Sequence, residues 1–278
     1  MALMRHEMRI SYGPVGDTIG EVKVEPGTWH MKGDELLLRA SGLAMRYRKG
    51  HGVTIEHDPG VRSSEEQLYL NGTVYAAAAC INGFYPLHAS AVAWNGGVHA
   101  FTGPAGAGKS TLVAALGSAG LPMFCDDTLI LDLSDPAVPL ALPGHKRLKL
   151  TDEALALTGA EAQEQVDDEI EKFYALPAGG DWQAPLPLRQ LIFLEGGDRT
   201  ETLPISGAEK IARLSDDHYT AELFLWANDM NIAHRFAAQS RLARQIAMVR
   251  LVRPWDTGQF TASVTLAREL IFAQAIQP

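Results

Sequence analysis

Cysteine is scarce in this chain. Only Cys80 and Cys125 occur among its 278 residues, and both stand in apolar surroundings without the spacing of metal ligands. One distant pair gives no disulfide framework and no zinc site. We therefore expect two buried free thiols. A chain of this kind fits a reducing, cytoplasmic compartment.

Long apolar runs are also missing. No run reaches the roughly 18 residues that a membrane span requires. Residues 1–9 are polar and lack the apolar segment of a secretion signal. We expect no membrane partner.

Positive charge is outweighed by negative charge. The chain has 24 Lys and Arg against 33 Asp and Glu, a net charge of −9. A nucleic-acid-binding protein needs a basic face to neutralise phosphates, so we expect no nucleic-acid partner. Apolar residues make up 46% and charged residues 21%, which is ordinary for a globular protein with a sizeable core.

The pattern predicts two modules with a boundary after residue 84. Residues 1–84 form a small β-rich module with one helix, in which apolar and polar residues alternate over 43–48 before a glycine turn at 50–52. This alternation and turn are typical of a hairpin. Ser63 and Glu66 have the spacing of a capping box, so a helix is expected to begin there and to continue through the alanine-rich run that follows.

Residues 85–278 have an α/β pattern. Predicted strands lie at 90–94, 98–102, 121–125, 190–194 and 246–252, with 128–133 extending the third, and predicted helices lie at 109–119, within 206–244 and at 261–276. The acidic stretch 161–171 is expected to be a solvated helix followed by a loop at 175–187. The alternative is that both form a mobile lid over a substrate.

A glycine-rich loop lies between a predicted strand and a predicted helix. Its residues are Gly103, Pro104, Ala105, Gly106, Ala107, Gly108, Lys109 and Ser110, which match G-x-x-x-x-G-K-[ST] at every fixed position. Such a P-loop points backbone N–H groups and a helix N-terminus at phosphates. Lys109 is expected to reach the β- and γ-phosphates, and the Ser110 hydroxyl to ligate Mg²⁺. Thr111 completes the predicted nucleotide-binding residues.

Two adjacent carboxylates, Asp126 and Asp127, follow a predicted buried strand. Burying both without a cation is costly. Ligands gather at the carboxyl ends of strands in doubly wound sheets, where Gly103 and Asp126 would both lie. One carboxylate can hold Mg²⁺ while the other accepts the proton of an attacking hydroxyl. The alternative is an ordinary pair of turn residues.

Two basic features stand near these elements. His88 precedes the strand at 90–94 and, taken alone, is either a packed core histidine or a site residue. The segment 143–149 is a basic cluster in an acidic protein. It is either solvated surface or a contact to phosphate or an acidic substrate, and Arg147 is the preferred contact because its planar fork suits phosphate.

Together, the run from His88 to Val92, the P-loop and the Asp126–Asp127 pair resemble the core of HPr kinase/phosphorylase across about 45 residues. The resemblance implies the P-loop core that this family shares with phosphoenolpyruvate carboxykinases. It also implies ATP and Mg²⁺ as cofactors, with Ser110 and Asp126 facing the metal. Asp127 would be the base, and His88 would lie near the transferred phosphate. Arg147 and Lys172 are weaker assignments, and the roles of the two aspartates could be exchanged.

The whole chain resembles more closely the compact HPr-kinase-like proteins of peptide-modification systems, including lasso-peptide precursor kinases. The resemblance implies transfer of the γ-phosphoryl group to a hydroxyl, typically the C-terminal serine of a precursor peptide. It is compatible with assembly into a homo-oligomer. Thr111 stands where HPr kinases usually have a glutamate after the GKS serine, and a shorter segment replaces their long N-terminal domain. HPr is therefore not the expected substrate.

Two other functions stay open from the sequence. The first is a kinase of a small hydroxylated metabolite, with the 161–187 region as a lid. The second is a nucleotide-binding regulatory module, against which the intact Lys109, Ser110 and aspartate pair argue. No L-S-G-G-Q or N-K-x-D segment points to a transporter ATPase or a GTPase switch.

Overall fold

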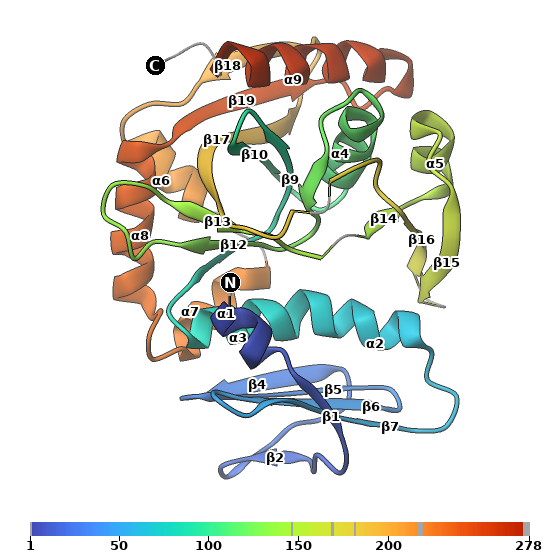
Figure 1. The fold of residues 1–278 in the computed structure, drawn as a ribbon, viewed down its shortest axis with the longest axis vertical. Coiled ribbons are helices and arrows are strands. Elements are labelled where there is room, and N and C mark those ends of the chain that lie inside the picture. The colour runs from blue at the N-terminus through green and yellow to red at the C-terminus, as the bar shows by residue number, and fades with distance from the viewer. Residues whose placement is uncertain (1, 146, 168–169, 181, 216–218, 275–278) are drawn as a thin grey trace. The chain divides into compact units, whose positions relative to one another are not determined.

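The computed structural model describes residues 2–145, 147–167, 170–180, 182–215 and 219–274 (Figure 1). The chain divides into two units. The first contains Met1–Pro86 together with Tyr219–Ala238, and the second contains Leu87–His218 and Gln239–Pro278. The first segment ends two residues beyond the predicted boundary, and the later segment at 219–238 was placed by the sequence in the other module.

A sheet forms the centre of the first unit. Its strands lie in the order β1 (Ile10–Tyr12), β7 (Gly52–His57), β6 (Leu43–Arg48), β5 (Glu35–Ala40) and β4 (Thr28–Lys32), and β2 (Thr18–Ile19) pairs with β3 (Val22–Lys23). The predicted hairpin is confirmed, because β6 and β7 pair antiparallel from Leu43–His57 to Arg48–Gly52. Met45 and Tyr47, on the apolar face of β6, are fully buried.

Helices accompany this sheet. They are α1 (Ala2–Glu7), α2 (Ser63–Tyr69), the π-helical turn η1 (Leu70–Val74) and α3 (Tyr75–Ile81). The alanine run is helical and buried, as predicted. The predicted capping box is wrong: the N-cap is Arg62, whose carbonyl accepts from the amides of Glu65 and Glu66 without a side-chain cap. Ser63 already lies inside the helix, where its hydroxyl accepts from Gln67.

The segment 219–238 packs within the first unit. It contains η2 (Tyr219–Glu222), α7 (Leu223–Trp226) and the start of α8 (Ile232–Gln245). The Phe224 ring lies 5.3 Å from that of Tyr85, and Nζ of Lys49 lies 2.5 Å from a carboxylate oxygen of Asp229. The buried Cys80 thiol donates to the Met230 carbonyl. These contacts explain why the segment belongs to this unit.

A mixed sheet forms the centre of the second unit. Its strands include β9 (Ala89–Trp94), β10 (Gly97–Thr102), β11 (Met123–Cys125), β12 (Leu129–Asp132), β13 (Leu140–Leu142), β17 (Leu186–Gly196), β18 (Glu201–Pro204) and β19 (Ala247–Arg253). The strand β8 (Tyr85–Leu87) crosses the division between the units. β10, β17 and β19 are parallel, and β11 is parallel to β10 because both pair antiparallel with β9. These four strands therefore end at one edge of the sheet.

Helices complete the second unit. They are α4 (Lys109–Ser118), α5 (Asp152–Thr158), α6 (Ala208–Ser215), the short η3 (Thr257–Gln259) and α9 (Phe260–Gln274). Leu112 and Leu116 of α4, Ile192 and Leu194 of β17, and Ile271 of α9 belong to one fully buried apolar cluster. The helices predicted at 109–119 and from 261 are confirmed, and residues 275–276 lie outside the described part.

Two predictions for this unit are wrong. The first concerns residues 128–133, which do not extend β11: β12 pairs with β13, whereas β11 pairs with β9. The chain turns between them at Asp127, whose φ is +68°. The acidic stretch is not a helix either. It forms the strands β15 (Ala162–Asp167) and β16 (Ile170–Ala175), which pair with each other and with β14 (Leu148–Leu150).

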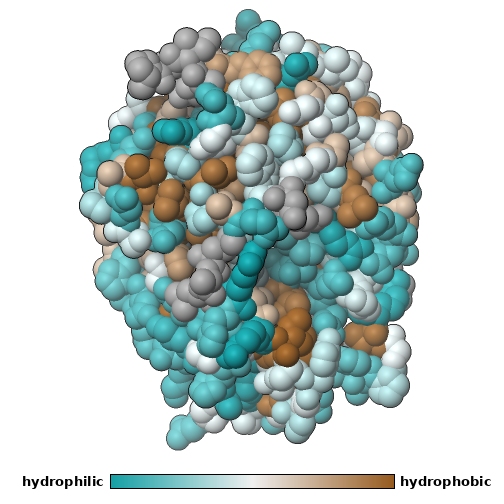
Figure 2. Space-filling view, in the orientation of Figure 1, coloured by the Kyte–Doolittle hydropathy of each residue, from teal (hydrophilic) through white to brown (hydrophobic). Residues whose placement is uncertain are grey.

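Burial explains why the acidic stretch forms the β15–β16 hairpin. Val166, Tyr174 and Ala175 are buried, while Glu164 and Glu171 are exposed, so burial favours a strand over the local helix propensity. Cys80 and Cys125 are buried free thiols, as predicted. Hydrophilic residues cover most of the face shown in Figure 2, and hydrophobic ones appear there as separate small patches. No helix among the described residues has both the length and the apolar character needed to cross a bilayer.

Candidate functional site

The strand order brings the predicted site residues to one edge of the second unit's sheet. Thr102 at the end of β10 lies opposite Ala89 at the start of β9, and Cys125 at the end of β11 lies opposite Ala91. His88 precedes β9, Gly103 follows β10 and Asp126 follows β11. Segments from three different strands therefore meet there, as the sequence predicts for Gly103 and Asp126.

The glycine loop connects β10 to α4. Gly103, Gly106 and Gly108 have φ values of +147°, +80° and +79°, which L-residues rarely adopt. A Cβ on Gly103 would lie 2.7 Å from the Leu194 carbonyl oxygen, so this position also requires a residue without a side chain. The loop ends where α4 begins at Lys109, whose turn adds the positive end of the helix dipole. A backbone with this geometry could hold an anion.

The Lys109 side chain folds back across the loop. Its Nζ donates to the carbonyl oxygens of Gly103 at 2.9 Å and Pro104 at 3.2 Å, and the side chain is buried. Pro104, Ala105 and Gly106 are exposed, whereas Ala107 is buried. The outer rim of the loop is thus open to a ligand, with the ammonium group inside it. Thr111 is half-buried in the first turn of α4.

Asp126 contacts the first turn of α4 through Ser110. Its Oδ1 accepts hydrogen bonds from Ser90 at 2.6 Å and Ser110 at 2.8 Å, and its Oδ2 accepts the Lys149 amide at 3.3 Å. Burial raises the pKa of this carboxyl, and the neighbouring charge of Asp127 raises it further. A positive charge placed here would stabilise the ionised form.

Asp127 faces a different set of groups. Its Oδ2 lies 2.8 Å from Nζ of Lys149, and its Oδ1 lies 3.6 Å from Nδ1 of His88. Burial alone would raise the pKa of Asp127, but Lys149, His88 and Lys109 hold it below the usual range. Because the backbone has a positive φ, Asp127 turns away from its neighbour, and the two carboxylates serve different partners.

His88 is oriented by the backbone. Its Nδ1 lies 3.0 Å from the Asp127 carbonyl oxygen, which can only accept, so Nδ1 carries the proton. The Thr102 hydroxyl donates to the His88 carbonyl at 3.1 Å. These bonds place the imidazole beside Asp127.

The basic cluster contributes a different residue from the one preferred in the sequence. Arg147 lies 2.5 Å from a carboxylate oxygen of Glu164, and its guanidinium lies 3.9 Å from the centre of the Tyr174 ring. Lys149, two residues later on β14, is the cation that contacts Asp127. Lys172 is exposed on β16, and Lys146 lies outside the described residues.

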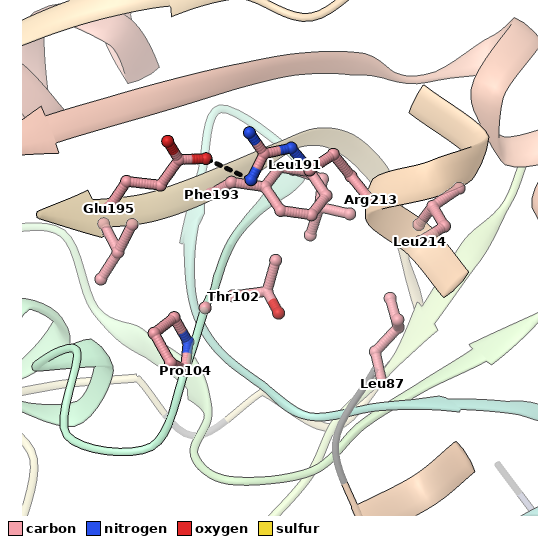
Figure 3. A pocket seen from close by; sticks show the side chains of 10 residues that line it. Leu87, Thr102, Pro104, Leu191, Phe193, Glu195, Arg213 and Leu214 are labelled. Carbon is pink, nitrogen blue, oxygen red and sulfur yellow. Dashed lines mark ion pairs between the residues drawn. The ribbon is translucent and has the colours of Figure 1, made fainter. Parts of the chain in front are cut away.

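A small pocket of about 150 Å³ opens at the start of the loop (Figure 3). Its lining includes Thr102, Gly103 and Pro104 at the end of β10, with leucine and phenylalanine side chains from β17. An ion pair between Arg213 and Glu195, at 2.5 Å, lies at one side. The pocket combines an apolar lining with one charged pair and borders the glycine loop.

The sequence also missed Ser90 and Arg253. Ser90 holds Asp126, and Arg253 at the end of β19 donates to the Ala107 carbonyl of the loop at 2.8 Å. The available signal for Arg253 was a charged residue at the carboxyl end of a predicted apolar strand. No signal in the sequence marked Ser90 beyond its place in the run from His88 to Val92.

A metal ion could be held by Ser110 and Asp126. No group of three or more His, Cys, Asp and Glu side chains within the described residues forms a complete cluster of ligands. Mg²⁺, however, binds one or two protein oxygens and completes its shell with water and phosphates. The neighbouring Ser110 hydroxyl and Asp126 carboxylate fit that requirement.

No protein-family model matches the chain, and no curated protein matches it significantly. Among solved structures, the chain is similar to the HPr(Ser) kinase/phosphatase from Coxiella burnetii. The two are 11% identical, the match covers 68% of this chain and 99% of that chain, and the TM-score is 0.34. The relationship is a distant one in structure.

Proposed function

We propose that this protein is a kinase that transfers the γ-phosphoryl group of ATP to a hydroxyl group. The observation that carries the proposal is the 2.8 Å contact between Ser110, at the end of a phosphate-binding loop, and Asp126, whose neighbour Asp127 faces a lysine and a histidine. Phosphate-binding groups and a pair of functionally separate carboxylates thus meet at one place.

The loop would bind the polyphosphate. Its backbone N–H groups and the N-terminus of α4 attract the phosphate oxygens. Lys109 would exchange its bonds to the Gly103 and Pro104 carbonyls for bonds to the β- and γ-phosphates. A cation held at that point offsets the negative charge of the phosphoryl group in the transition state.

Ser110 and Asp126 would hold Mg²⁺, which supplies charge neutralisation to the phosphates when bound. Asp126 has the character that this role requires, because it is buried and its ionised form lacks a cationic partner in direct contact within the described residues. The hydroxyl groups of Ser90 and Ser110 keep its Oδ1 in position.

Asp127 would orient the acceptor hydroxyl and take its proton. Lys149 and His88 keep this carboxylate ionised and fixed. Its low pKa suits a reaction in which the transition state is loose and the base serves mainly to position the hydroxyl. Nδ1 of His88 holds the Asp127 carbonyl, and the imidazole would lie near the transferred group.

The proposed acceptor is a serine hydroxyl, most specifically the C-terminal serine of a lasso or other ribosomal precursor peptide. The sequence resemblance supports this choice. A small hydroxylated metabolite is the second candidate, and the pocket of about 150 Å³ beside Gly103 favours it because that volume suits a small group.

Transfer of ³²P from [γ-³²P]ATP tests the proposal. The purified chain is incubated with Mg²⁺ and either serine-ending peptides or a panel of small alcohols, and Lys109→Ala is the matched variant. We expect labelled peptide with the wild type and weaker ATP binding and transfer with the variant. ATP binding without transfer to any acceptor would indicate a regulatory module instead, and absence of ATP binding would reject the proposal.

A further inference from the structure

Arg253 lies directly against the phosphate-binding loop. It ends β19, one of the parallel strands that finish at the site edge, and its side chain is 6% exposed. Its Nη2 donates to the Ala107 carbonyl at 2.8 Å. A Cβ on Gly108 would lie 2.5 Å from the same nitrogen, so the guanidinium is in close contact with the last turn of the loop.

This contact fixes the direction of a loop amide. The carbonyl of Ala107 and the N–H of Gly108 belong to one planar trans peptide, in which they point in opposite directions. By holding the carbonyl, Arg253 turns the Gly108 N–H away from itself. Gly106 and Gly108, both with positive φ, allow the alternating backbone that gathers such N–H groups into an anion cradle.

The positive charge of the Arg253 guanidinium has no nearby negative charge among the described residues. Among the described residues no carboxylate pairs with it, and its buried Nε has no hydrogen-bond partner. The remaining neighbours are the rings of Trp255 and Phe260, whose centres lie 5.0 and 5.8 Å away. Burial lowers the pKa of Arg253, the direction expected for a cation without a counter-ion. An isolated buried charge is unfavourable until an opposite charge comes near.

We infer that Arg253 is a positioning residue of the polyphosphate site, and that the phosphates supply its missing counter-charge. The inference rests on the proposed function, since it requires a polyphosphate in the loop. Arg253 acts through the loop peptide and through its charge, which is weakly screened at a buried position. Its contribution to binding should therefore grow with the number of phosphates on the ligand.

Calorimetric titration of AMP, ADP, ATP and pyrophosphate with Mg²⁺ tests this dependence. Arg253→Gln keeps an N–H donor but removes the charge, and Arg253→Lys keeps the charge but loses the planar fork. Arg268→Gln is the matched control, because Arg268 also stacks on a ring, that of Phe272, on helix α9. Circular dichroism checks that each variant is folded.

We expect Arg253→Gln to weaken ATP and pyrophosphate binding about tenfold and AMP binding less than about twofold. Arg253→Lys should stay within about threefold of the wild type for all ligands, and Arg268→Gln should match the wild type. Equal losses for AMP and ATP, or no loss, would overturn the inference.

If Arg253→Gln does not fold, Arg253→Lys decides the question. A uniform loss across the four ligands in that variant would show that packing, and not charge, is what matters. If the wild type binds neither ATP nor pyrophosphate, the proposed function fails instead, so the two failures are distinguishable.

Discussion

The Ser110 hydroxyl donates a hydrogen bond of 2.8 Å to Oδ1 of Asp126, sixteen residues later in the chain. The same oxygen accepts from Ser90 at 2.6 Å, and the other oxygen accepts the amide of Lys149 at 3.3 Å. One buried carboxylate therefore connects the first turn of α4 with β9 and β14. A cation that binds at Ser110 would act directly on this carboxylate.

Asp126→Asn should stabilise the unliganded protein at neutral pH. The amide oxygen can still accept from both hydroxyl groups, and only the 3.3 Å bond from the Lys149 amide is lost, whereas the charge that burial disfavours is removed. The pKa of Asp126 is raised above its ordinary 3.8, so the folded state binds more protons than the unfolded state. As the pH rises above 3.8, Asp126 ionises more readily in the unfolded state than in the folded state. Its ionisation therefore lowers the free energy of unfolding as the pH rises.

Urea denaturation of both proteins at pH 4 and pH 7 measures this effect. The advantage of Asp126→Asn should be larger at pH 7, by about 1 kcal/mol or more. Mg²⁺ with ATP should reduce the advantage, since only the aspartate can neutralise a cation. An advantage that does not change with pH would show that desolvation of Asp126 is not the cause.

Asp127→Asn should abolish transfer and spare nucleotide binding. The amide cannot take a proton, and general-base catalysis typically contributes about 10²- to 10⁴-fold to a rate. Single-turnover transfer of labelled phosphate measures the rate, and calorimetry measures the ATP affinity. Transfer at close to the wild-type rate would remove the base assignment from Asp127. Loss of ATP binding would point instead to a role in holding the nucleotide.

Lys149→Met should destabilise the fold by about 1–2 kcal/mol at pH 7, because it leaves the half-buried Asp127 carboxylate without its cation. In the folded protein the pKa of Asp127 is held below its ordinary value of 3.8. The stabilisation that ionised Asp127 gives is therefore complete above pH 3.8, and it is lost as the pH falls through the pKa of the folded state. The difference between variant and wild type should therefore shrink in acid.

Lys172→Met is the control for Lys149→Met. Lys172 is exposed on the neighbouring strand β16, so its removal should change the free energy of unfolding by less than about 0.5 kcal/mol. Equal losses for the two lysines would show that the contact between Lys149 and Asp127, at 2.8 Å, contributes nothing specific.

Two glycines of the loop should respond differently to alanine. A Cβ at Gly103 would lie 2.7 Å from the Leu194 carbonyl, whereas a Cβ at Gly106 meets no atom within 4 Å. Gly103→Ala should cost about 3 kcal/mol, and Gly106→Ala only the backbone strain of about 1 kcal/mol. Thermal and urea denaturation measure both, and a Gly106→Ala loss as large as that of Gly103→Ala would contradict the steric argument.

Much of the second unit could be predicted from local sequence patterns. The apolar runs of β9, β10, β17 and β19 and the helix after the glycine loop carry strong local signals, and these elements lie where expected. The acidic strands β15 and β16 could not be predicted, because the local pattern does not reveal that Tyr174 on β16 pairs with Lys149 on β14. The break at Asp127 was missed because aspartate adopts a positive φ at only a minority of its positions, and the sequence does not show which.

The site was predictable where its residues are neighbours in a motif. The glycine loop, Lys109, Ser110 and the aspartate pair could be found in this way. Lys149 and Arg253 could not, because their roles depend on which strand end lies beside the loop. The choice of Arg147 followed guanidinium chemistry, whereas in the fold Arg147 contacts Glu164 and Tyr174 and Lys149 contacts Asp127.

The first unit is assembled from two separated parts of the chain, Met1–Pro86 and Tyr219–Ala238. During translation the ribosome must therefore complete most of the second unit before it delivers Phe224 to Tyr85 or Asp229 to Lys49. The newly made N-terminal part has to wait, with Tyr85 and the surfaces of α3 and β4 that α7 contacts uncovered, for a segment that is synthesised much later. Any fragment that stops at Pro86 would retain that uncovered surface, so expression of the N-terminal part alone should yield an aggregating polypeptide.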